Sequence, residues 1–399
     1  AGAIQVLHGL IPYRDFFYDK PPLAMLFYLP FGAYPGAPLR VAGALYAFFC
    51  CWLMYRLARD VWGDREARTA ALLLAFFLVF GIQAAVTAVA PDLLLLAPHL
   101  AAVHFAWQRR PFAAGLIAAA GMLVHTKAVF VLAACALFCP SPWLLAGFVP
   151  GLLPLAWPPY WEQVIWWGQV YARNTFIADP WREGIMRTAN WVGFHAALVL
   201  PALPVLRDWR LAAWALLMLG SVALGERFFP RYYFALLPPL VLAAARTKWR
   251  TVMLLLLLIP LARFGPRYAL LAAGEPWRDL ALYEQSAAAA TWLNANARPG
   301  DTIFVWGYRP EVNVLTRMPL GTPYLESQPL SGVFADRHLT ESAGVEPEFI
   351  AQQRRRFAES EPTWIVDGLG PLNSKLAFSR DGYEVARELP GVRIYRRRN

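Results

Sequence analysis

The chain has 399 residues, of which 58% are hydrophobic and only 16% are charged, and it carries a net charge of +10. The apolar residues fall in long runs, which excludes an ordinary soluble globular protein and predicts a protein that crosses a membrane several times. Because the basic residues form short clusters between these runs, we interpret the positive charge as a topology signal and expect no nucleic-acid partner. The four cysteines lie inside apolar runs without metal-ligand spacing, so no metal site is predicted.

Residues 1–36 are predicted to form the first external loop, next to the membrane. The stretch HGLIPYRDFFYDKPPLAML (8–26) places two acids, an arginine and a lysine among aromatic residues and prolines. One interpretation is that these charges anchor the loop at the membrane interface, where aromatic and cationic residues are common. The other is that the cations bind an anionic group at the interface, because guanidinium and ammonium groups bind phosphate oxygens.

The membrane part is predicted to extend over residues 37–266 and to contain about ten apolar segments. Several of them are shorter than the roughly 20 residues that a straight spanning helix needs. We therefore expect broken or re-entrant helices among them. The segments lie near residues 40–58, 68–87, 92–107, 112–124, 128–139, 142–157, 190–206, 211–225, 231–246 and 250–264.

Four clusters of basic residues separate these segments and determine the predicted topology. With ten crossings every cluster falls on one face of the membrane, as the positive-inside bias requires. If residues 112–139 formed a single helix, the last two clusters would fall on the outer face. His125–Lys127 is therefore predicted to be a turn at the external surface. The clusters are residues 55–68, 107–110, 207–210 and 246–250.

The same topology gathers the remaining loops on the external side. The longest of them, residues 158–189, mixes Trp and Tyr with scattered charges and has an apolar face over its first half. This pattern predicts a helix that lies in the membrane interface. The other external segments are the opening loop, Pro91–Asp92, the turn at His125–Lys127, Glu226–Arg231 and all residues after about 265.

The composition changes after residue 275, and residues 275–399 are predicted to form a small α/β domain outside the membrane. Short apolar runs with strand character occur there together with segments of helical periodicity. Residues 265–277 are the predicted connector. The predicted helices are 284–301, which ends in an Arg-Pro-Gly-Asp turn, and 346–360, and the predicted strands are 301–307, 363–368 and 392–397.

The opening loop also carries a motif. The stretch GLIPYRDFFYDKPPLAMLFYLPFGAY (9–34) and the apolar segments after it resemble the first external loop and following helices of the polyprenyl-phosphate-sugar glycosyltransferases of the GT-C class. The HTK turn at 125–127, the segment ERFFPRYYFALLPPL (226–240) and the C-terminal domain fit the same class. Within it, the chain is similar to the bacterial branch of the dolichyl-phosphate-mannose protein mannosyltransferase family, which includes the lipid A aminoarabinose transferases.

This resemblance implies a mainly α, multi-pass membrane bundle of the GT-C type with a small C-terminal α/β domain outside the membrane. It implies an inverting, metal-independent glycosyltransferase that moves a sugar from a polyprenyl-phosphate donor to a hydroxyl of a protein, lipid or polysaccharide. The expected location is a bacterial inner membrane, with the active site and the C-terminal domain facing the periplasm or exterior. No cofactor is expected besides the lipid-linked donor, and the expected partners are membrane lipid, the donor and a hydroxyl acceptor.

The chemistry of such a transfer suggests roles for individual residues. Cations must hold the departing phosphate, because negative charge grows on its oxygen as the glycosidic bond breaks. By the resemblance, the expected donor phosphate ligands are Arg14, Lys20, Lys127 and Arg231. Residues expected to line the cavity or to contact the acceptor are Tyr18, Asp92, Glu226 and Arg227.

A carboxylate must also take the proton of the acceptor hydroxyl. The usual catalytic acid of the family lies shortly before the Gly-x-x-Pro-Tyr stretch, and this chain begins at Ala1 without one. We expect that this residue belongs to an upstream segment lost by truncation. Asp15 and Asp19 are the alternatives within the chain, and Asp19 fits a residue that organises the ligand site better than it fits the base.

Ordinary structural roles remain open for the same residues. Lys127 lies between two apolar runs and is explained equally by a side chain that extends to the surface. Asp92 follows Pro91, which favours helix capping. Glu226, Arg227 and Arg231 are also explained by salt pairing at a helix end. For the whole chain, the alternatives to an enzyme are a non-catalytic membrane scaffold and a transporter of lipid-linked material.

Overall fold

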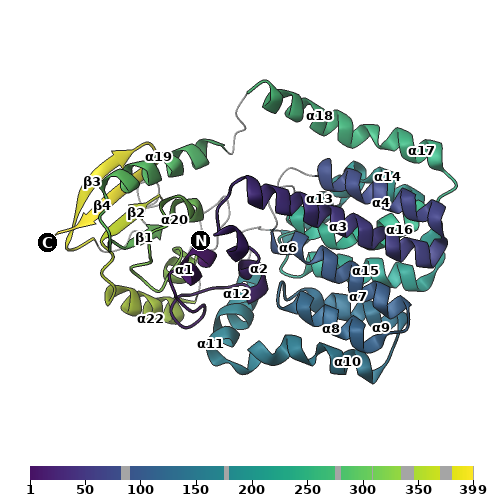
Figure 1. Cartoon of the computed structure of the whole chain (residues 1–399), viewed down its shortest axis with the longest axis horizontal. Coiled ribbons are helices and arrows are strands. Elements are labelled where there is room, and N and C mark those ends of the chain that lie inside the picture. The colour runs from purple at the N-terminus through teal and green to yellow at the C-terminus, as the bar shows by residue number, and fades with distance from the viewer. Residues whose placement is uncertain are drawn as a thin grey trace.

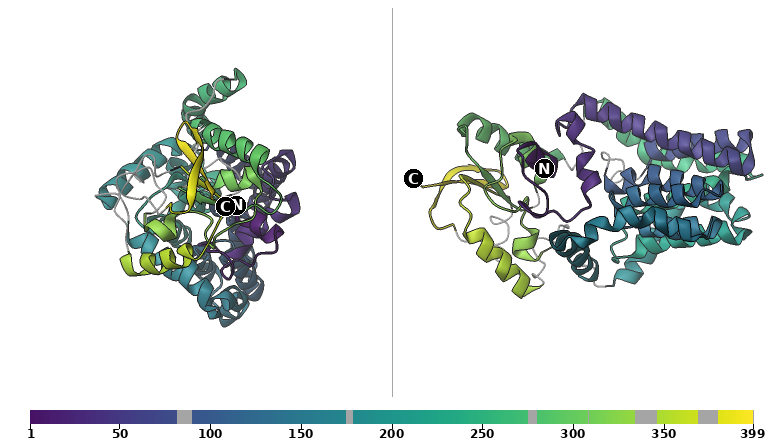
Figure 2. Two further views of the ribbon diagram at one scale, coloured as in Figure 1. Left: turned by 90° about the vertical axis from the view of Figure 1, so that its left-hand side faces the viewer. Right: turned by 60° about the horizontal axis from the view of Figure 1, so that its bottom comes forward.

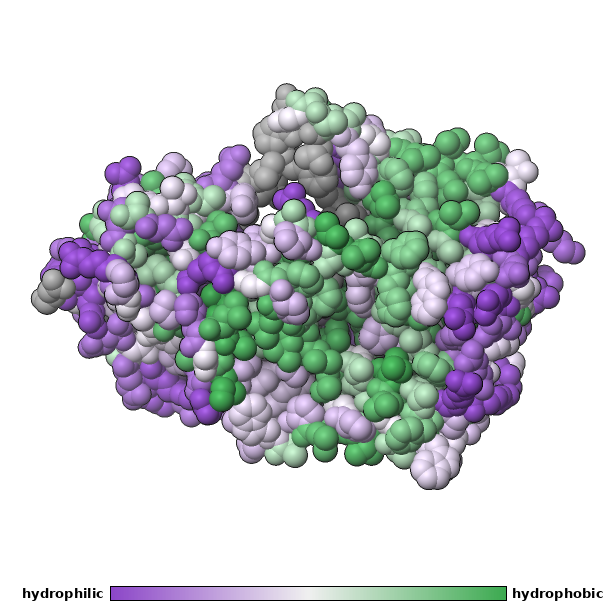
Figure 3. Space-filling model, in the orientation of Figure 1, coloured by the Kyte–Doolittle hydropathy of each residue, from purple (hydrophilic) through white to green (hydrophobic). Residues whose placement is uncertain are grey.

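The computed structural model describes residues 1–81, 90–174, 179–274, 280–307, 309–333, 346–368 and 380–398. The chain forms a bundle of apolar helices and a smaller C-terminal unit that contains a mixed β-sheet (Figure 1). A hydrophobic surface covers the bundle between two hydrophilic ends (Figure 3). The predicted fold class, a mainly α membrane protein with a small C-terminal α/β part, is therefore confirmed.

Most helices of the bundle are short. Two stretches, Ala37–Trp62 and Arg250–Leu270, are long and apolar enough to cross a membrane by length and composition alone. Proline lies at the first turn of α6, α8 and α10, where its missing N–H group costs no hydrogen bond. The bundle consists of α3 (Ala37–Trp62), α4 (Asp64–Val79), α6 (Pro91–Leu94), α7 (Leu96–Trp107), α8 (Pro111–Met122), α9 (Ala128–Phe138), α10 (Pro142–Phe148), η2 (Val149–Ala156), α13 (Pro180–Phe194), α14 (Ala196–Ala202), η4 (Val205–Arg207), α15 (Trp209–Ala223), η5 (Pro230–Leu236), α16 (Leu237–Ala245), α17 (Arg250–Leu256) and α18 (Leu258–Ala272).

The breaks between these helices test the predicted segments. The turn predicted at His125–Lys127 is present, because α8 ends at Met122 and α9 begins at Ala128. The predicted connector 265–277 is wrong at its start, since α18 continues through Pro266 to Ala272. The helix continues past Gly265 and Pro266, because helical hydrogen bonds are the main way to satisfy a backbone among apolar surroundings. The end of the connector, and residues 82–87 of the second apolar segment, lie outside the described residues.

Small residues allow α8 and α10 to approach closely. A Cβ atom at Gly115 would lie 2.1 Å from the carbonyl oxygen of Leu144, and one at Gly147 would lie 2.2 Å from that of Phe112. Such backbone contacts through small residues are the usual way in which helices associate in a membrane. This contact holds α8 in place, and the C-terminal end of α8 leads into the turn that carries Lys127.

One end of the bundle gathers the predicted basic clusters. Arg250 of the fourth cluster lies 4.0 Å from Glu66 of the first. His104 and Gln108, at the end of α7, bond to Asp60 of the first cluster at 2.7 and 2.8 Å. The first, second and fourth clusters therefore lie at the same end, as predicted, and this end forms the hydrophilic surface on the right of Figure 3.

The opposite end meets the N-terminal segment and the C-terminal unit. Figures 1 and 2 place the N-terminus between the bundle and the sheet. The first 36 residues, predicted as a loop, contain three short helices: α1 (Gly2–Leu7), α2 (Pro22–Leu26) and η1 (Leu29–Phe31). The predicted interfacial segment 158–189 is helical where it is described, through α11 (Pro158–Tyr160), the π-helical turn η3 (Trp161–Trp166), α12 (Trp167–Arg173) and the start of α13, whereas residues 175–178 lie outside the described residues.

The C-terminal unit is a four-stranded sheet with helices on both faces. Its strand order is β1-β2-β4-β3, with β1 and β2 parallel and the other pairs antiparallel. The three predicted strands and two predicted helices are present, whereas β3, α20 and α21 were not predicted. Strand β3 was missed because its charged residues and mostly exposed side chains give no apolar alternation. The elements are α19 (Leu280–Asn296), β1 (Ile303–Trp306), α20 (Pro310–Thr316), α21 (Gln328–Ser331), α22 (Pro347–Ala358), β2 (Trp364–Asp367), β3 (Tyr383–Leu389) and β4 (Val392–Arg397).

Candidate functional site

Arg14 and Asp15 form a local pair in the first external loop. The Arg14 guanidinium donates to both carboxylate oxygens of Asp15, at 2.8 and 2.9 Å, and the backbone N–H of Ile11 donates to the same carboxylate at 2.7 Å. The hydrogen bond from Arg14 holds the pKa of Asp15 below its usual value. The Arg14 side chain is 60% exposed. The structure thus places Arg14, an expected phosphate ligand, and Asp15, an expected alternative base, together in a turn that faces solvent.

Lys20 and Asp19 form a second pair, closer to the bundle. The Lys20 ammonium donates to Asp19 at 2.7 Å, and both side chains remain partly exposed. The Tyr13 hydroxyl donates to the carbonyl oxygen of Lys20 at 2.7 Å, and Pro21 follows directly in extended conformation. These contacts and the fixed φ of proline hold the backbone at Lys20 in one conformation.

A buried glutamine attaches this loop to the segment 158–173. The Gln163 amide donates to the carbonyl oxygen of Tyr13 and accepts from the backbone N–H of Tyr18, both at 2.8 Å. The Tyr18 ring packs against the rings of Tyr13 and Phe16, and burial raises the pKa of the Tyr18 phenol. Tyr18, expected to line a cavity, therefore packs within the loop, and the buried face of the 158–173 segment contacts protein.

Asp92 is the centre of an ionic cluster at the external end of the bundle. Its carboxylate lies 3.7 Å from the Lys127 ammonium, 3.5 Å from the Arg231 guanidinium and 3.6 Å from Nε2 of His125. Only 9% of the Asp92 side chain is exposed. Sequence segments more than a hundred residues apart therefore meet here, and two of the four expected phosphate ligands, Lys127 and Arg231, lie side by side.

The capping role favoured for Asp92 is wrong. Ala90 is the N-cap residue of α6, and no side chain caps this helix. Asp92 lies one residue inside the first turn, where its carboxylate is directed to the cations instead of to the backbone. The neighbouring turn supports this arrangement, because Nδ1 of His125 accepts from the backbone N–H of Lys127 at 3.2 Å, which leaves the proton on Nε2, the atom that faces Asp92.

The contacts of this cluster are looser than direct hydrogen bonds. Charge-assisted N–H to carboxylate bonds are about 2.7–2.9 Å long, whereas those around Asp92 are 3.5–3.7 Å. The Lys127 ammonium also lies 3.3 Å from the centroid of the Tyr232 ring, where the electron-rich face attracts a cation. The ammonium is thus held by charge and by a ring face, and its N–H groups are well placed for an additional acceptor.

A second tyrosine extends the cluster toward Lys20. The hydroxyl groups of Tyr171 and Tyr232 interact, and the Lys20 ammonium lies 5.9 Å from the Tyr171 ring. The buried Arg227 guanidinium stacks on this ring at 3.9 Å and donates to the carbonyl oxygens of Tyr171 and Asn174. Arg227 therefore fixes the end of α12 and gives the site further positive charge.

Glu226 differs from Arg231 in its ion pairing. It lies in a turn with φ of +56° ahead of η5. Within the described part of the chain, no ion pair involves its side chain, whereas Arg231 pairs with Asp92, so the salt pairing considered at this helix end is observed for Arg231 and not for Glu226. Glu226 is thus adjacent to the cluster along the chain without being paired to it.

The sequence analysis did not single out Glu326, a carboxylate whose charge interacts with that of the first loop. It lies in the C-terminal unit, after a segment that pairs with the first loop: the Phe17 backbone N–H donates to the carbonyl oxygen of Pro323 at 2.8 Å. Burial, followed by the charge of Asp19, raises the pKa of Glu326 to about 8, and Lys20 opposes this shift. No local pattern marks such a residue, because only tertiary contacts bring it to the loop. Gln163, Tyr171 and Tyr232 were missed for the same reason, although the aromatic character of 158–189 had been noted.

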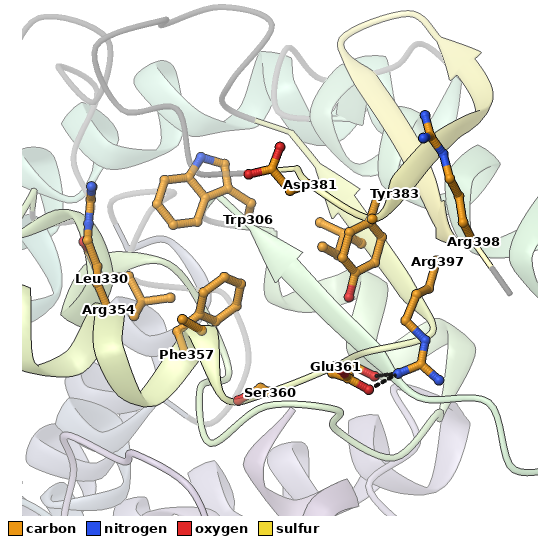
Figure 4. Close-up of a pocket in the computed structure, with 13 residues that line it drawn as sticks. Trp306, Leu330, Arg354, Phe357, Ser360, Glu361, Asp381, Tyr383, Arg397 and Arg398 are labelled. Carbon is orange, nitrogen blue, oxygen red and sulfur yellow. Dashed lines mark hydrogen bonds and ion pairs between the residues drawn. The ribbon is translucent and has the colours of Figure 1, made fainter.

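The C-terminal unit also contains a separate cavity of about 780 Å³, shown in Figure 4. Trp306, Phe357 and Tyr383 line it together with cationic side chains, and the Arg397 guanidinium pairs with Glu361 at 2.5 Å on one side. None of the residues that were expected to form the site lies in this cavity. Over the described ranges, no group of three or more His, Cys, Asp or Glu side chains could hold a metal ion.

Comparisons with known proteins identify a family to which part of the chain is similar. Residues 19–149 match the family model described as "Dolichyl-phosphate-mannose-protein mannosyltransferase". This segment is about a third of the chain and contains Asp19, Lys20, Asp92, His125 and Lys127. No curated protein matches the sequence.

Among solved structures, the chain is similar to the oligosaccharyltransferase of Archaeoglobus fulgidus. One structure, a complex with Zn and sulfate, has 15% sequence identity and a TM-score of 0.46, with 92% of this chain and 62% of that chain covered. A second, in complex with an inhibitory peptide and a dolichol-phosphate, has 14% identity and a TM-score of 0.47, with 88% and 61% covered. The chain spans about three fifths of the length of that enzyme. The segment that carries Lys20, Asp92 and Lys127 is the part of the chain that is similar in sequence to a mannosyltransferase family of the GT-C class.

Proposed function

We propose that the protein transfers a sugar from a polyprenyl-phosphate donor to an acceptor hydroxyl at the external face of a membrane. The observation that carries this proposal is the meeting of Lys127 and Arg231 at one buried carboxylate, Asp92, with Lys20 close by. A polyprenyl phosphate is anchored in the bilayer by its lipid and has its phosphate at the interface. The cluster lies at the end of an apolar bundle and offers cations at that level.

The cations would stabilise the leaving group. As the acceptor oxygen gives its proton to a carboxylate base and forms its bond to the anomeric carbon, the bond between that carbon and the phosphate oxygen breaks, and the electron pair stays on the phosphate. Lys127 and Arg231 would receive this charge in a site that is preorganised by Asp92 and Tyr232. The products are a glycoside with inverted configuration and a polyprenyl phosphate.

Lys20 and Asp19 would act on the loop side of the same phosphate. The 2.7 Å contact from Lys20 to Asp19 orients the ammonium, and the bond from Tyr13 fixes its backbone. Asp19 is thereby an organiser of Lys20 and not a free base. Arg14 would serve the loop through Asp15, because its side chain is directed to solvent in that pair.

The distribution of basic residues between the two ends of the bundle predicts the side of the membrane on which the activity lies. The end of the bundle with the basic clusters would face the cytoplasm, and the Asp92 cluster with the C-terminal unit would face the periplasm or exterior. The resemblance of the opening loop to the bacterial branch of the family supports a bacterial inner membrane and an acceptor that is a protein, lipid or polysaccharide.

Replacement of Lys20 tests this proposal. The purified chain in phospholipid vesicles would be given a panel of radiolabelled polyprenyl-phosphate sugars together with protein, glycolipid and polysaccharide acceptors. We expect Lys20→Ala to reduce transfer about 100-fold or more, because one cation fewer faces the leaving phosphate. Lys248→Ala, at the opposite end of the bundle, is the matched control and should transfer at the wild-type rate. Unchanged transfer by Lys20→Ala would remove Lys20 from the site.

A further inference from the structure

The turn that precedes Arg231 has a strained backbone. In this entry turn, residues 225–228, the φ angles of Gly225, Glu226 and Phe228 are +93°, +56° and +45°, in the left-handed region. Glycine adopts this region freely, but a bulky aromatic residue does so rarely and at a cost in conformational free energy. Such a conformation persists only where the surrounding contacts hold it, and it is most common at functional sites.

Arg227 connects the entry turn to two helices. Its buried side chain donates to the carbonyl oxygens of Asn174 and Tyr171, at 2.7 and 3.1 Å, at the end of α12. Its backbone is held from α13, because its carbonyl oxygen accepts from the Arg187 guanidinium at 2.8 Å. Glu183 orients this guanidinium at 2.7 Å. The entry turn is thus bonded to α12 through a side chain and to α13 through the main chain.

Phe228 fills a notch on α13. Gly184 is buried there, and a Cβ atom added to it would lie 2.7 Å from Cδ2 of Phe228 and closer still to two other atoms of the ring. The ring therefore occupies the volume that a larger residue at position 184 would take. The Trp181 ring packs edge-on against it, with 6.1 Å between the centroids, and Phe228 is only 5% exposed. This close packing stabilises the residue whose backbone is most strained.

Only two residues separate Phe228 from Arg231, and the chain between them is constrained. Phe229 is extended, and Pro230 fixes φ at the start of η5. The Tyr232 backbone N–H donates to the Phe229 carbonyl oxygen at 2.9 Å, and the Arg231 guanidinium lies 5.4 Å from the centroid of the Phe229 ring. A shift of Phe228 is therefore transmitted to Arg231 and Tyr232.

Arg231 and Tyr232 are the residues of η5 that contribute to the ionic cluster. The Arg231 guanidinium lies 3.5 Å from Asp92, and the centroid of the Tyr232 ring lies 3.3 Å from the Lys127 ammonium. Groups that stabilise a leaving phosphate act best when they are in place before the reaction. A displacement of about 1 Å can lower a rate about 100-fold. The placement of both residues depends on the entry turn.

We propose that Phe228, seated in the notch at Gly184, is the positioning residue that sets Arg231 and Tyr232 against the donor phosphate, an inference that rests on the proposed transfer reaction. Phe228 acts through these two residues and not on the reacting atoms. The packing of its ring offsets the strain of the entry turn, and η5 thereby begins at one fixed position relative to α6, which carries Asp92.

The test compares Gly184→Ala with Gly193→Ala in the full chain in vesicles. Both glycines lie in α13 without a left-handed φ, so the change in helix propensity is the same, but a Cβ atom at Gly193 would meet nothing within 4 Å. Gly184→Ala should displace the Phe228 ring and weaken the binding of polyprenyl phosphate about 10-fold, the equivalent of one charge-assisted hydrogen bond. It should lower kcat/KM for the donor about 100-fold and leave KM for the acceptor unchanged. Gly193→Ala should match wild type throughout.

A double variant shows whether Gly184 acts through Phe228. Phe228→Ala alone should weaken donor binding, and Gly184→Ala should add no further loss in that background, because the added methyl group no longer meets a ring. Losses that multiply in the double variant would overturn the inference. Equal losses toward donor and acceptor would indicate a general distortion of the fold and would overturn it as well.

Two further results separate the failure of this inference from the failure of the proposed function. If a folded Gly184→Ala variant binds polyprenyl phosphate as the active wild-type chain does, the positioning role is wrong, whereas the transfer reaction stands. If the wild-type chain neither binds polyprenyl phosphate nor transfers sugar, the proposed function itself fails. Should Gly184→Ala prove unstable in a thermal melt, Phe228→Leu, which shortens the side chain in the notch, decides the matter: weaker donor binding supports the positioning role, and wild-type affinity in a folded variant contradicts it.

Discussion

The two ends of the helical bundle both carry cations, but they hold them in different ways. At one end, Arg250 is partly exposed and approaches Glu66 at 4.0 Å. At the other, Lys127 and Arg231 approach Asp92, a carboxylate that is only 9% exposed. The first arrangement pairs one cation with one acid in contact with water. The second directs two cations and a histidine to a single buried acid.

This difference separates two uses of the same residue types. Exposed pairs contribute little to stability and mainly record which end of a membrane protein faces the cytoplasm. Burial of positive charge beyond its carboxylate partner is costly, and such an arrangement is retained at ligand sites, where an anion completes the neutralisation. Burial and convergence therefore mark the binding end more clearly than the number of basic residues does.

The largest effect is expected for Lys127→Ala, which removes the most buried cation of the cluster. Loss of one group that stabilises charge on the leaving phosphate should lower kcat/KM for sugar transfer about 10²–10³-fold. The measurement is transfer from the labelled donor in vesicles over a range of donor concentrations. Wild-type kcat/KM in a folded Lys127→Ala variant would show that the two ends of the bundle do not differ in the proposed way.

A smaller effect is expected for Asp92→Asn, which leaves the cations and removes their partner. Loss of a buried carboxylate should destabilise the fold by about 3 kcal/mol, because Lys127 remains buried with its charge uncompensated. Thermal unfolding in detergent measures this loss. Added polyprenyl phosphate should then raise the melting temperature of Asp92→Asn more than that of wild type, since the phosphate takes the place of the missing charge. An equal rise in both proteins would argue against phosphate binding at this cluster.

The smallest effect is expected for Arg250→Ala at the opposite end. An ion pair in contact with water is worth about 0–1 kcal/mol, so the melting temperature should change by at most a few degrees. Transfer should proceed at the wild-type rate, because the pair with Glu66 is remote from the Asp92 cluster. A large loss of transfer in this variant would remove the distinction between the two ends.

Much of the architecture followed from local patterns. Apolar runs indicated the bundle, and the positions of the basic clusters required the turn at His125–Lys127, which the structure contains. Strand-like runs indicated β1, β2 and β4. Errors occurred where a local signal competed with the surroundings. Residues 265–277 were predicted as a connector, but α18 continues to Ala272. Pro91-Asp92 suggested a cap, but Asp92 pairs with cations.

The residues of the candidate site could be predicted from the sequence only in part. Resemblance of the opening loop to a known class directed attention to Lys20, Lys127 and Arg231, which the structure gathers around Asp92 and its neighbours. It also directed attention to Arg14, which the structure places in an exposed pair with Asp15. Glu326, whose charge interacts with that of the first loop, carried no signal, because a single acid before a short helix is common in any soluble domain.

The sequence by itself determined that this protein is a membrane-embedded helical bundle with a small α/β unit, because hydrophobic runs, basic clusters and turn residues act over short distances along the chain. Only the tertiary structure decided which charges meet. Contacts such as those of Lys127 with Asp92, or of the Phe17 segment with Pro323, depend on how helices and sheet pack in three dimensions. The strength of an electrostatic interaction depends on the distance between the charges in space. Residues hundreds of positions apart become neighbours only when the helices and the sheet pack together.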